Sequence, residues 1–264
     1  MMLLRSYAVL VLFLITMPIL IMIPISFNSG HTLKLTFSDY SLKWYENFFN
    51  NELWLESLGR SISTALLVAA LSTVIGGMAA LSVNRLSFPG KNIFMNLMVA
   101  PMVIPVIVVG IALYHSFSFL KLNDTVLGVV LGHSIVAIPL VFVTMMAGLK
   151  GVQRDLELAA QSLGSTPIGA FFKVTFPLLR LSIFASFFFA FSTSLDEVII
   201  SIFVAGPSTK TLPILLWENM RTQLEPTIAV AATILILGTI TAFLAPKVID
   251  LFKKALSTAA DKRS

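Results

Sequence analysis

Cysteine is absent from the 264 residues of this chain, and charged residues make up only 12% of it. The absence of cysteine excludes disulfide bonds and thiolate metal sites. A soluble globular domain has about twice that fraction of charged side chains. Histidine is also scarce. His31, His115 and His133 are scattered along the chain, and we expect each to be a loop or helix-packing residue rather than a metal ligand.

Apolar residues of the set AVILMFWYC make up 57% of the chain, and the mean hydropathy is +0.92. A soluble core of this size could not bury so much apolar surface and still cover itself with polar groups. A lipid bilayer removes that conflict. The net charge is +5, but the basic residues lie mostly in short loops and form no cluster with aromatic residues. The composition therefore predicts an all-α membrane protein that binds no nucleic acid.

Six stretches are long and apolar enough to cross a bilayer, which takes about 20 residues. They lie at residues 7–27, 61–83, 92–117, 126–149, 181–204 and 227–249. The first stretch is long for the apolar region of a signal peptide, contains Pro18 and Pro24, and is followed by no small-x-small cleavage site, so we interpret it as an uncleaved span.

The distribution of Lys and Arg predicts the orientation. With the N-terminus inside, twelve of these 18 side chains fall on the cytoplasmic side and six on the other. Since cytoplasmic loops are rich in Lys and Arg, both termini are predicted to be cytoplasmic. The chain then divides into a first span with an outer loop (1–56), a core of five spans (57–250) and a cytoplasmic tail (251–264).

Several predicted spans contain proline and glycine in mid-helix, among them Pro101, Pro105 and Gly110 in the third, and Gly132 and Pro139 in the fourth. Proline removes a backbone hydrogen bond, so such helices pack against protein or a cavity and not against lipid alone. A kinked helix within a bundle and a helix that lines a path both fit this pattern.

The outer loop, residues 28–59, is too long for a simple turn. Among its charged residues it holds the aromatic residues Trp44, Tyr45, Phe48, Phe49 and Trp54. This mixture fits a segment at the membrane surface, or a docking surface for an outside partner.

The cytoplasmic loop at residues 150–180 is predicted to form two short helices. The first has an apolar stripe at i, i+3, i+4 and i+7, formed by Leu156, Ala159, Ala160 and Leu163. Gly164 stands where a helix stop is expected. The stripe can pack against the bundle or the membrane surface, or it can lie in a groove on a partner.

The second short helix should begin with Thr166 as its cap and Pro167 at its first position. Phe171, Phe172 and Val174 follow as apolar residues. Pro177 is expected to break this helix before the fifth span.

This loop resembles the EAA loop of the permease subunits of ABC importers. The pattern of that loop is Glu-Ala-Ala, three residues to a Gly, a spacer and then Leu-Pro. Ala159, Ala160, Gly164 and Pro177 stand at the matching positions, whereas Leu158 occupies the usual Glu position, next to Glu157, and Phe176 replaces the usual Leu.

The resemblance extends over about residues 57–244, which are similar to the second permease subunit of spermidine/putrescine importers. A short R-x-x-F-x-G-K turn matches at Arg85, Phe88, Gly90 and Lys91. Further matches lie around the fourth, fifth and sixth spans and include His133, Pro139, Ser194, Asp196, Gly206 and Pro226.

The resemblance implies a type I ABC importer permease with six transmembrane helices in a bacterial inner membrane. It implies three kinds of partner: cytoplasmic ATPase subunits, a second homologous permease and an extracytoplasmic substrate-binding protein. The residues implied for ATPase coupling are Glu157, Ala159, Ala160, Leu163, Gly164 and Pro177. The ATPases supply the free energy, so the chain is not expected to be an enzyme or to need a cofactor. Neither a complete P-loop nor an H-E-x-x-H motif is present.

Two acids, Asp196 and Glu197, lie within the fifth apolar stretch. A carboxylate near the bilayer centre costs at least about 2.5 kcal/mol, so such a residue normally faces a cavity or a partner. On a continuous helix Asp196 would lie over Ser192 and Glu197 over Ser194, on different faces.

A polyamine path would use carboxylates, and the predicted path residues are Asp196, Glu197, Ser192 and Ser194. The alternative is that the helix is interrupted, or lies near the outer surface, and the acids are simply hydrated.

Other functions stay open at this point. Related permeases transport other small polar solutes, including amino-phosphonates, opines and iron complexes. A secondary transporter driven by an ion gradient should show internal repeats and paired broken helices, and no repeat is present. A membrane-embedded enzyme should show a catalytic cluster at one depth, and the sequence shows none.

Overall fold

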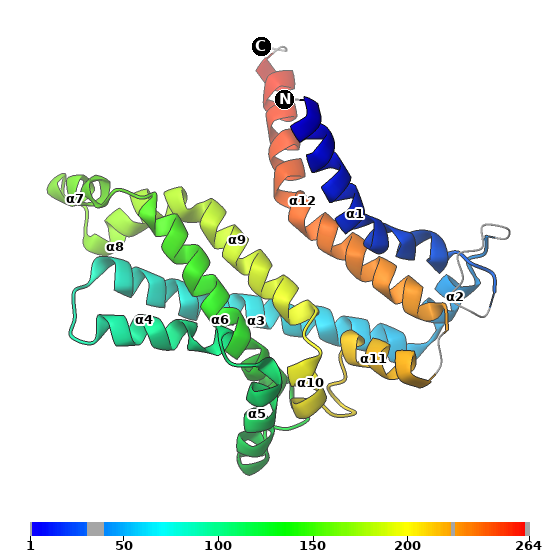
Figure 1. Ribbon diagram of the computed structural model, residues 1–264. Coiled ribbons are helices and arrows are strands. Elements are labelled where there is room, and N and C mark those ends of the chain that lie inside the picture. Colours follow the sequence, from blue (N-terminus) through cyan, green and yellow to red (C-terminus); the bar gives the residue numbers. More distant parts are fainter. Residues whose placement is uncertain (1, 31–39, 223–224, 262–264) are drawn as a thin grey trace. The chain divides into compact units, whose positions relative to one another are not determined.

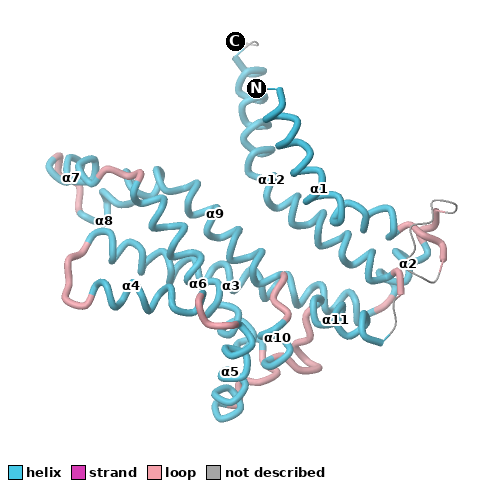
Figure 2. The backbone as a smooth tube through the Cα atoms, viewed as in Figure 1, coloured by secondary structure: helices cyan, strands magenta, loops and turns pink. Residues whose placement is uncertain are grey.

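The protein is seen in a computed structural model that describes residues 2–30, 40–222 and 225–261 (Figure 1). His31 lies outside the described residues. The described segments are helical apart from connecting loops, as Figure 2 shows. The α-helices are α1 (Met2–Ser26), α2 (Lys43–Asn50), α3 (Glu52–Arg85), α4 (Lys91–Val99), α5 (Val106–Leu120), α6 (Val126–Lys150), α7 (Arg154–Ser162), α8 (Pro167–Ala170), α9 (Phe176–Leu195), α10 (Ile199–Val204), α11 (Leu212–Thr222) and α12 (Thr227–Asp261). A 3-10 turn, η1 (Ala100–Met102), follows α4, and a π-helical turn, η2 (Phe171–Thr175), precedes α9.

The chain forms two compact units, one of residues 1–56 with 215–264 and one of residues 57–214. In the first unit α1 and α2 both pack against α12. The Ser26 hydroxyl bonds the Tyr45 hydroxyl at 2.8 Å, and Asn47 donates to the Thr227 hydroxyl at 3.0 Å. Trp44 and Phe48 of the outer loop are buried, so these aromatic residues pack inside the unit. The sequence-based division at 57–250 stays a prediction.

In the second unit α6 packs against α4 and α9 (Figure 1). The core cluster joins small and branched residues of α3 to α6 and includes Ala69, Ala80, Val141 and Met145. Small residues allow the backbones to approach closely, as is usual between helices in membranes. A Cβ built on Gly76 of α3 would lie 2.8 Å from Val141 Cγ1 of α6, so glycine is required at that crossing.

Five helices are long and apolar enough to cross a membrane: residues 4–26, 52–85, 126–150, 167–195 and 227–244. The predicted third span is not one straight helix. The segments Lys91–Met102 and Val106–Leu120 meet at 98°, and they make a sixth span only if the bent pair counts as one. Pro101 lies in η1 and Pro105 caps α5, so prolines stand on both sides of the bend.

The predicted fifth span, 181–204, is wrong at both ends. The helix starts earlier, at Pro167, and stops at Leu195, before the two acids. Polar residues follow this stop, and α10 then begins as a separate short helix at Ile199 (Figure 2).

Candidate functional site

The loop between α6 and α9 contains the two predicted short helices. α7 ends in a Schellman motif, in which Gly164 adopts φ +94° and Ser165 N–H donates to the Ala160 carbonyl at 3.0 Å. The Thr166 hydroxyl accepts a hydrogen bond from Gly169 N–H at 3.1 Å and caps α8, with Pro167 in its first turn. The predicted stop and cap are therefore confirmed.

The expected helix break at Pro177 is wrong. Residues 167–195 form one helical stretch, and Pro177 lies in the first turn of α9, directly after η2. Phe176 N–H bonds back to the Phe171 carbonyl, five residues earlier. This wider turn accommodates a residue that has no N–H of its own.

Three residues of the predicted α7 stripe, Leu156, Ala159 and Leu163, are exposed, whereas the fourth, Ala160, is half-buried. Leu163 is 89% exposed and Leu156 is 48% exposed. The inward face consists of Glu157, Ala160 and Gln161, which are half-buried and follow an i, i+3, i+4 pattern. The outward face is therefore available to a partner or to the membrane surface.

Glu157 lies on the inward face and has two partners. Its Oε2 lies 2.6 Å from Nη2 of Arg85 and accepts a hydrogen bond from the Thr175 hydroxyl at 3.0 Å. Nη2 of Arg85 makes no well-aligned hydrogen bond, so its contact with Glu157 is an ion pair. In the sequence, Arg85 is notable only as part of the R-x-x-F-x-G-K turn motif. The spacing of residues 85 and 157 does not show that they meet.

The polar residues after α9 do not follow helical faces, because the helix ends at Leu195. Asp196 is exposed at the C-cap of α9, while Glu197 is half-buried and accepts a hydrogen bond from Ile200 N–H at 3.0 Å. Asp196 N–H still closes the last turn on the Ser192 carbonyl at 3.2 Å, so Asp196 follows Ser192 by one helical turn, whereas Glu197 lies beyond the end of the helix. The interrupted helix, which the sequence left open as an alternative, is what the structure shows.

Ser194 faces a buried histidine and not open space. His133, on α6, is fully buried, and its Nδ1 lies 2.9 Å from Ser194 Oγ. Its Nε2 lies 2.7 Å from Oγ of Ser201 in α10. Because the Ser201 hydroxyl donates to the Glu197 carbonyl at 2.9 Å, it accepts from the imidazole, and Ser194 then donates to Nδ1. His133 therefore joins both sides of the helix break.

A second polar cluster lies between the α5–α6 loop and the α10–α11 loop. Asp124 accepts from Ser208 N–H at 3.1 Å, from Thr209 N–H at 3.1 Å and from the Thr209 hydroxyl at 2.9 Å. Burial acts to raise the pKa of Asp124, but the hydrogen bonds from Thr209 and Ser208 outweigh it and leave that pKa below its ordinary value. The carboxylate therefore stays charged and ties the two loops together.

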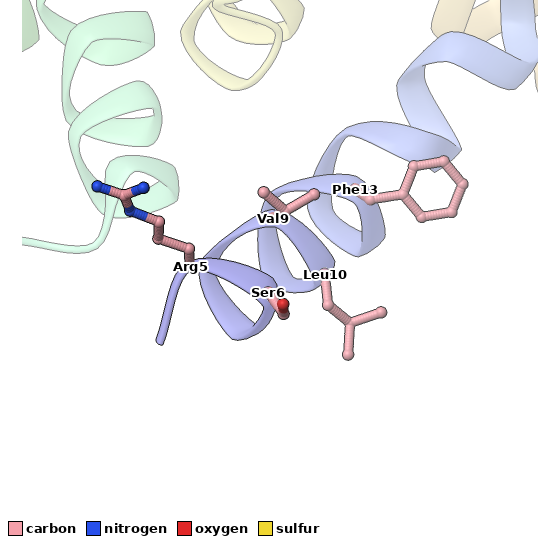
Figure 3. A pocket seen from close by; sticks show the side chains of 5 residues that line it. All are labelled: Arg5, Ser6, Val9, Leu10 and Phe13. Carbon is pink, nitrogen blue, oxygen red and sulfur yellow. The ribbon is translucent and has the colours of Figure 1, made fainter. Parts of the chain in front are cut away.

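Figure 3 shows a hollow lined by Arg5, Ser6, Val9, Leu10 and Phe13. All five residues belong to α1, and Val9, Leu10 and Phe13 are exposed apolar side chains. A binding site for a small polar solute brings together polar groups from several elements, so this hollow is no candidate. Within the described residues, no group of three or more His, Asp or Glu could bind a metal ion.

The comparison with known protein families decides the class. Residues 72–250 match the family described as binding-protein-dependent transport system inner membrane component. The chain belongs to this family. The match begins at Ser72, within α3, and ends within α12. It includes α7, the helix break and His133.

Two curated members of this family are similar to the chain over most of their length. The spermidine/putrescine transport system permease protein PotC of Haemophilus influenzae is 30% identical over 219 residues, which cover 83% of this chain and 85% of that protein. The putrescine transport system permease protein PotI of Escherichia coli is 31% identical over 230 residues, 84% of this chain and 81% of that protein.

A solved structure supports the same fold. A bacterial ABC transporter involved in the import of the acidic polysaccharide alginate superposes with a TM-score of 0.68 at 15% identity, covering 95% of both chains. At that identity the likeness concerns the fold alone. Together with the apolar helices, these findings make the chain a multi-pass membrane permease, a class without enzymatic activity of its own. The orientation of its termini stays a prediction.

Proposed function

We propose that this permease is the transmembrane subunit of an ATP-driven bacterial importer for polyamines such as spermidine and putrescine. The observation that supports the substrate is the similarity to PotC and PotI over more than 80% of each chain. The importer lies in the inner membrane and receives its substrate from an extracytoplasmic binding protein.

In this proposal the two acids at the helix break, Asp196 and Glu197, have different roles. Glu197 is half-buried, and its carboxylate is already engaged by the Ile200 N–H in the first turn of α10. Asp196 is exposed beside it. An exposed carboxylate at the end of a spanning helix fits a multiply charged ammonium substrate, whereas it would repel an anion such as an amino-phosphonate. We therefore assign substrate contact to Asp196, with Ser192 nearby, and a structural role to Glu197 and Ser194.

The substrate is tested by uptake of labelled spermidine and putrescine in cells that have no other polyamine importer. Deleting the gene should abolish uptake. Asp196→Asn should raise the substrate concentration for half-maximal uptake about tenfold, as for the loss of one hydrogen bond to a charged group, with normal membrane abundance. Asp196→Glu, which keeps the charge, should retain most of the uptake.

Unlabelled amino-phosphonates, opines and iron complexes should not compete for this uptake. Normal uptake after deletion would remove polyamines from the proposal and leave only the permease class. Full uptake by Asp196→Asn would instead remove only this residue from the substrate path.

The partners are a separate part of the proposal. Cytoplasmic ATPase subunits dock on the outward face of α7, where Leu156 and Leu163 are exposed and Ala159 lies between them. Gly164 ends this helix, and Pro177 stands where the loop joins α9. A second homologous permease completes the path.

Purification of the tagged chain in mild detergent tests the partners. We expect an ABC ATPase and a second permease to co-purify, because burial of an exposed apolar helix face favours association. If neither is recovered from cells in which the chain supports substrate uptake, an ion-coupled secondary transporter becomes the better interpretation.

A further inference from the structure

α7 has little that fixes its orientation apart from its inward face. None of its residues is fully buried, and the loops on both sides contain glycine, at Gly151 and Gly164. Ala160 is too small to anchor the helix by packing. α7 also packs on α8 and η2, but Glu157 is the one charged side chain on its inward face, so its contacts are the specific polar link of α7 to the rest of the unit.

Those contacts reach two other helical elements. Arg85 is the last residue of α3, and Thr175 is the last residue of η2, directly before α9. Both meet the same oxygen, Oε2 of Glu157. Figure 1 shows α7 near the turn where α3 ends. One carboxylate therefore joins α7 to the ends of two long apolar helices.

The pair lies where an ion pair is effective. The side chains of Arg85 and Glu157 are 16% and 15% exposed, and Thr175 is fully buried. A pair on the open surface contributes little because water screens it, whereas removing one member of a shielded pair leaves an uncompensated charge. The contact is thus strong enough to set the position of a short helix.

We propose that Arg85, Glu157 and Thr175 form an internal strut that makes α7 move together with α3 and α9. Glu157 is then a positioning residue and not a contact with the ATPase. A displacement of α7 by its partner passes to the membrane helices through this carboxylate. This inference rests on the proposed function for the docking of α7, but the strut itself is a property of the single chain.

The strut is tested first in the solubilised chain alone, by hydrogen exchange of the α7 amides. Glu157→Gln and Arg85→Gln should each speed exchange in α7 about tenfold, because local opening becomes easier. The charge-reversed double variant Arg85→Glu/Glu157→Arg should restore protection, since the Thr175 hydroxyl can accept from arginine as well as donate to glutamate. Asp155→Asn, an exposed acid of the same helix, is the matched control and should not change exchange.

The second readout is transport by the complete importer. Both single variants should lower the maximal rate about tenfold, the size of a typical coupling between two sites, without changing the substrate concentration for half-maximal uptake. The double variant should recover most of the rate. Membrane abundance of each variant separates this effect from misfolding.

Two results would overturn the strut. One is unchanged α7 exchange in Glu157→Gln. The other is a double variant that regains protection of the α7 amides but not the transport rate, because the charge of Glu157 would then be needed by a partner and not by Arg85. If the wild type does not take up spermidine, the proposed substrate is wrong. The exchange experiment then still tests the strut, because it does not depend on the substrate.

Discussion

Replacing His133 with alanine should lower the stability of the 57–214 unit by about 3 kcal/mol or more, among the largest effects of any single substitution. The imidazole is fully buried and bonds Ser194 on one side of the helix break and Ser201 on the other. Its removal leaves a cavity and two hydroxyls that lose their partner, and both effects are costly in a water-free interior. The thermal unfolding midpoint in detergent measures the loss.

His115→Ala is the matched control, since His115 is exposed on α5 and its truncation should change the midpoint little. His133→Gln should recover part of the stability because an amide both donates and accepts. We also expect His133→Ala to impair uptake, because the break that presents Asp196 loses its support from α6. A midpoint equal to that of the wild type would show that the histidine does not hold the break together.

Gly76→Ala should destabilise the same unit by about 1–3 kcal/mol, the usual cost of overpacking. The added Cβ would lie 2.8 Å from Val141 Cγ1, 2.9 Å from Val141 Cβ and 3.0 Å from the Ile138 carbonyl oxygen. A branched side chain and a backbone oxygen cannot both move aside without separating α3 from α6. The unfolding midpoint in detergent again measures the change.

The neighbouring Gly77 provides a control within the same helix. A Cβ there would lie 3.7 Å from the end of the Met145 side chain, an ordinary contact. Gly77→Ala should therefore be neutral or stabilise by up to about 1 kcal/mol, since alanine favours a helix more than glycine does. Equal effects of the two substitutions would contradict the close approach of α3 and α6 at Gly76.

Local sequence signals correctly predicted the helix stop and the helix cap in the loop at residues 150–180, because each of them acts within a few residues. Thr166 can cap only the turn that follows it, and Gly164 can end only the helix before it. The apolar stripe of α7 and the start of α6 at Val126 follow from the same short-range periodicity. The matching of these signals to a family motif also led to the correct family.

Long apolar stretches were easy to find, but their ends and bends were not. Hydropathy measures only the transfer of side chains to lipid, and residues 181–204 are apolar enough on that measure. It does not show where a backbone stops being helical. The end of α9 at Leu195, the 98° bend after Met102 and the continuous helix through Pro177 depend on how backbone groups find partners in three dimensions.

Sequence alone determined that this chain is a multi-pass membrane protein with a short amphipathic helix in one loop, because composition and periodicity are properties of neighbouring residues. Only the tertiary structure decided that Glu157 turns inward to Arg85, that Ser194 faces His133 and that Asp196 stays exposed at a helix break. The two contacts join residues that are 61 and 72 positions apart in the sequence. No local signal specifies such a partner, since it is the packing of whole helices that brings the two side chains together.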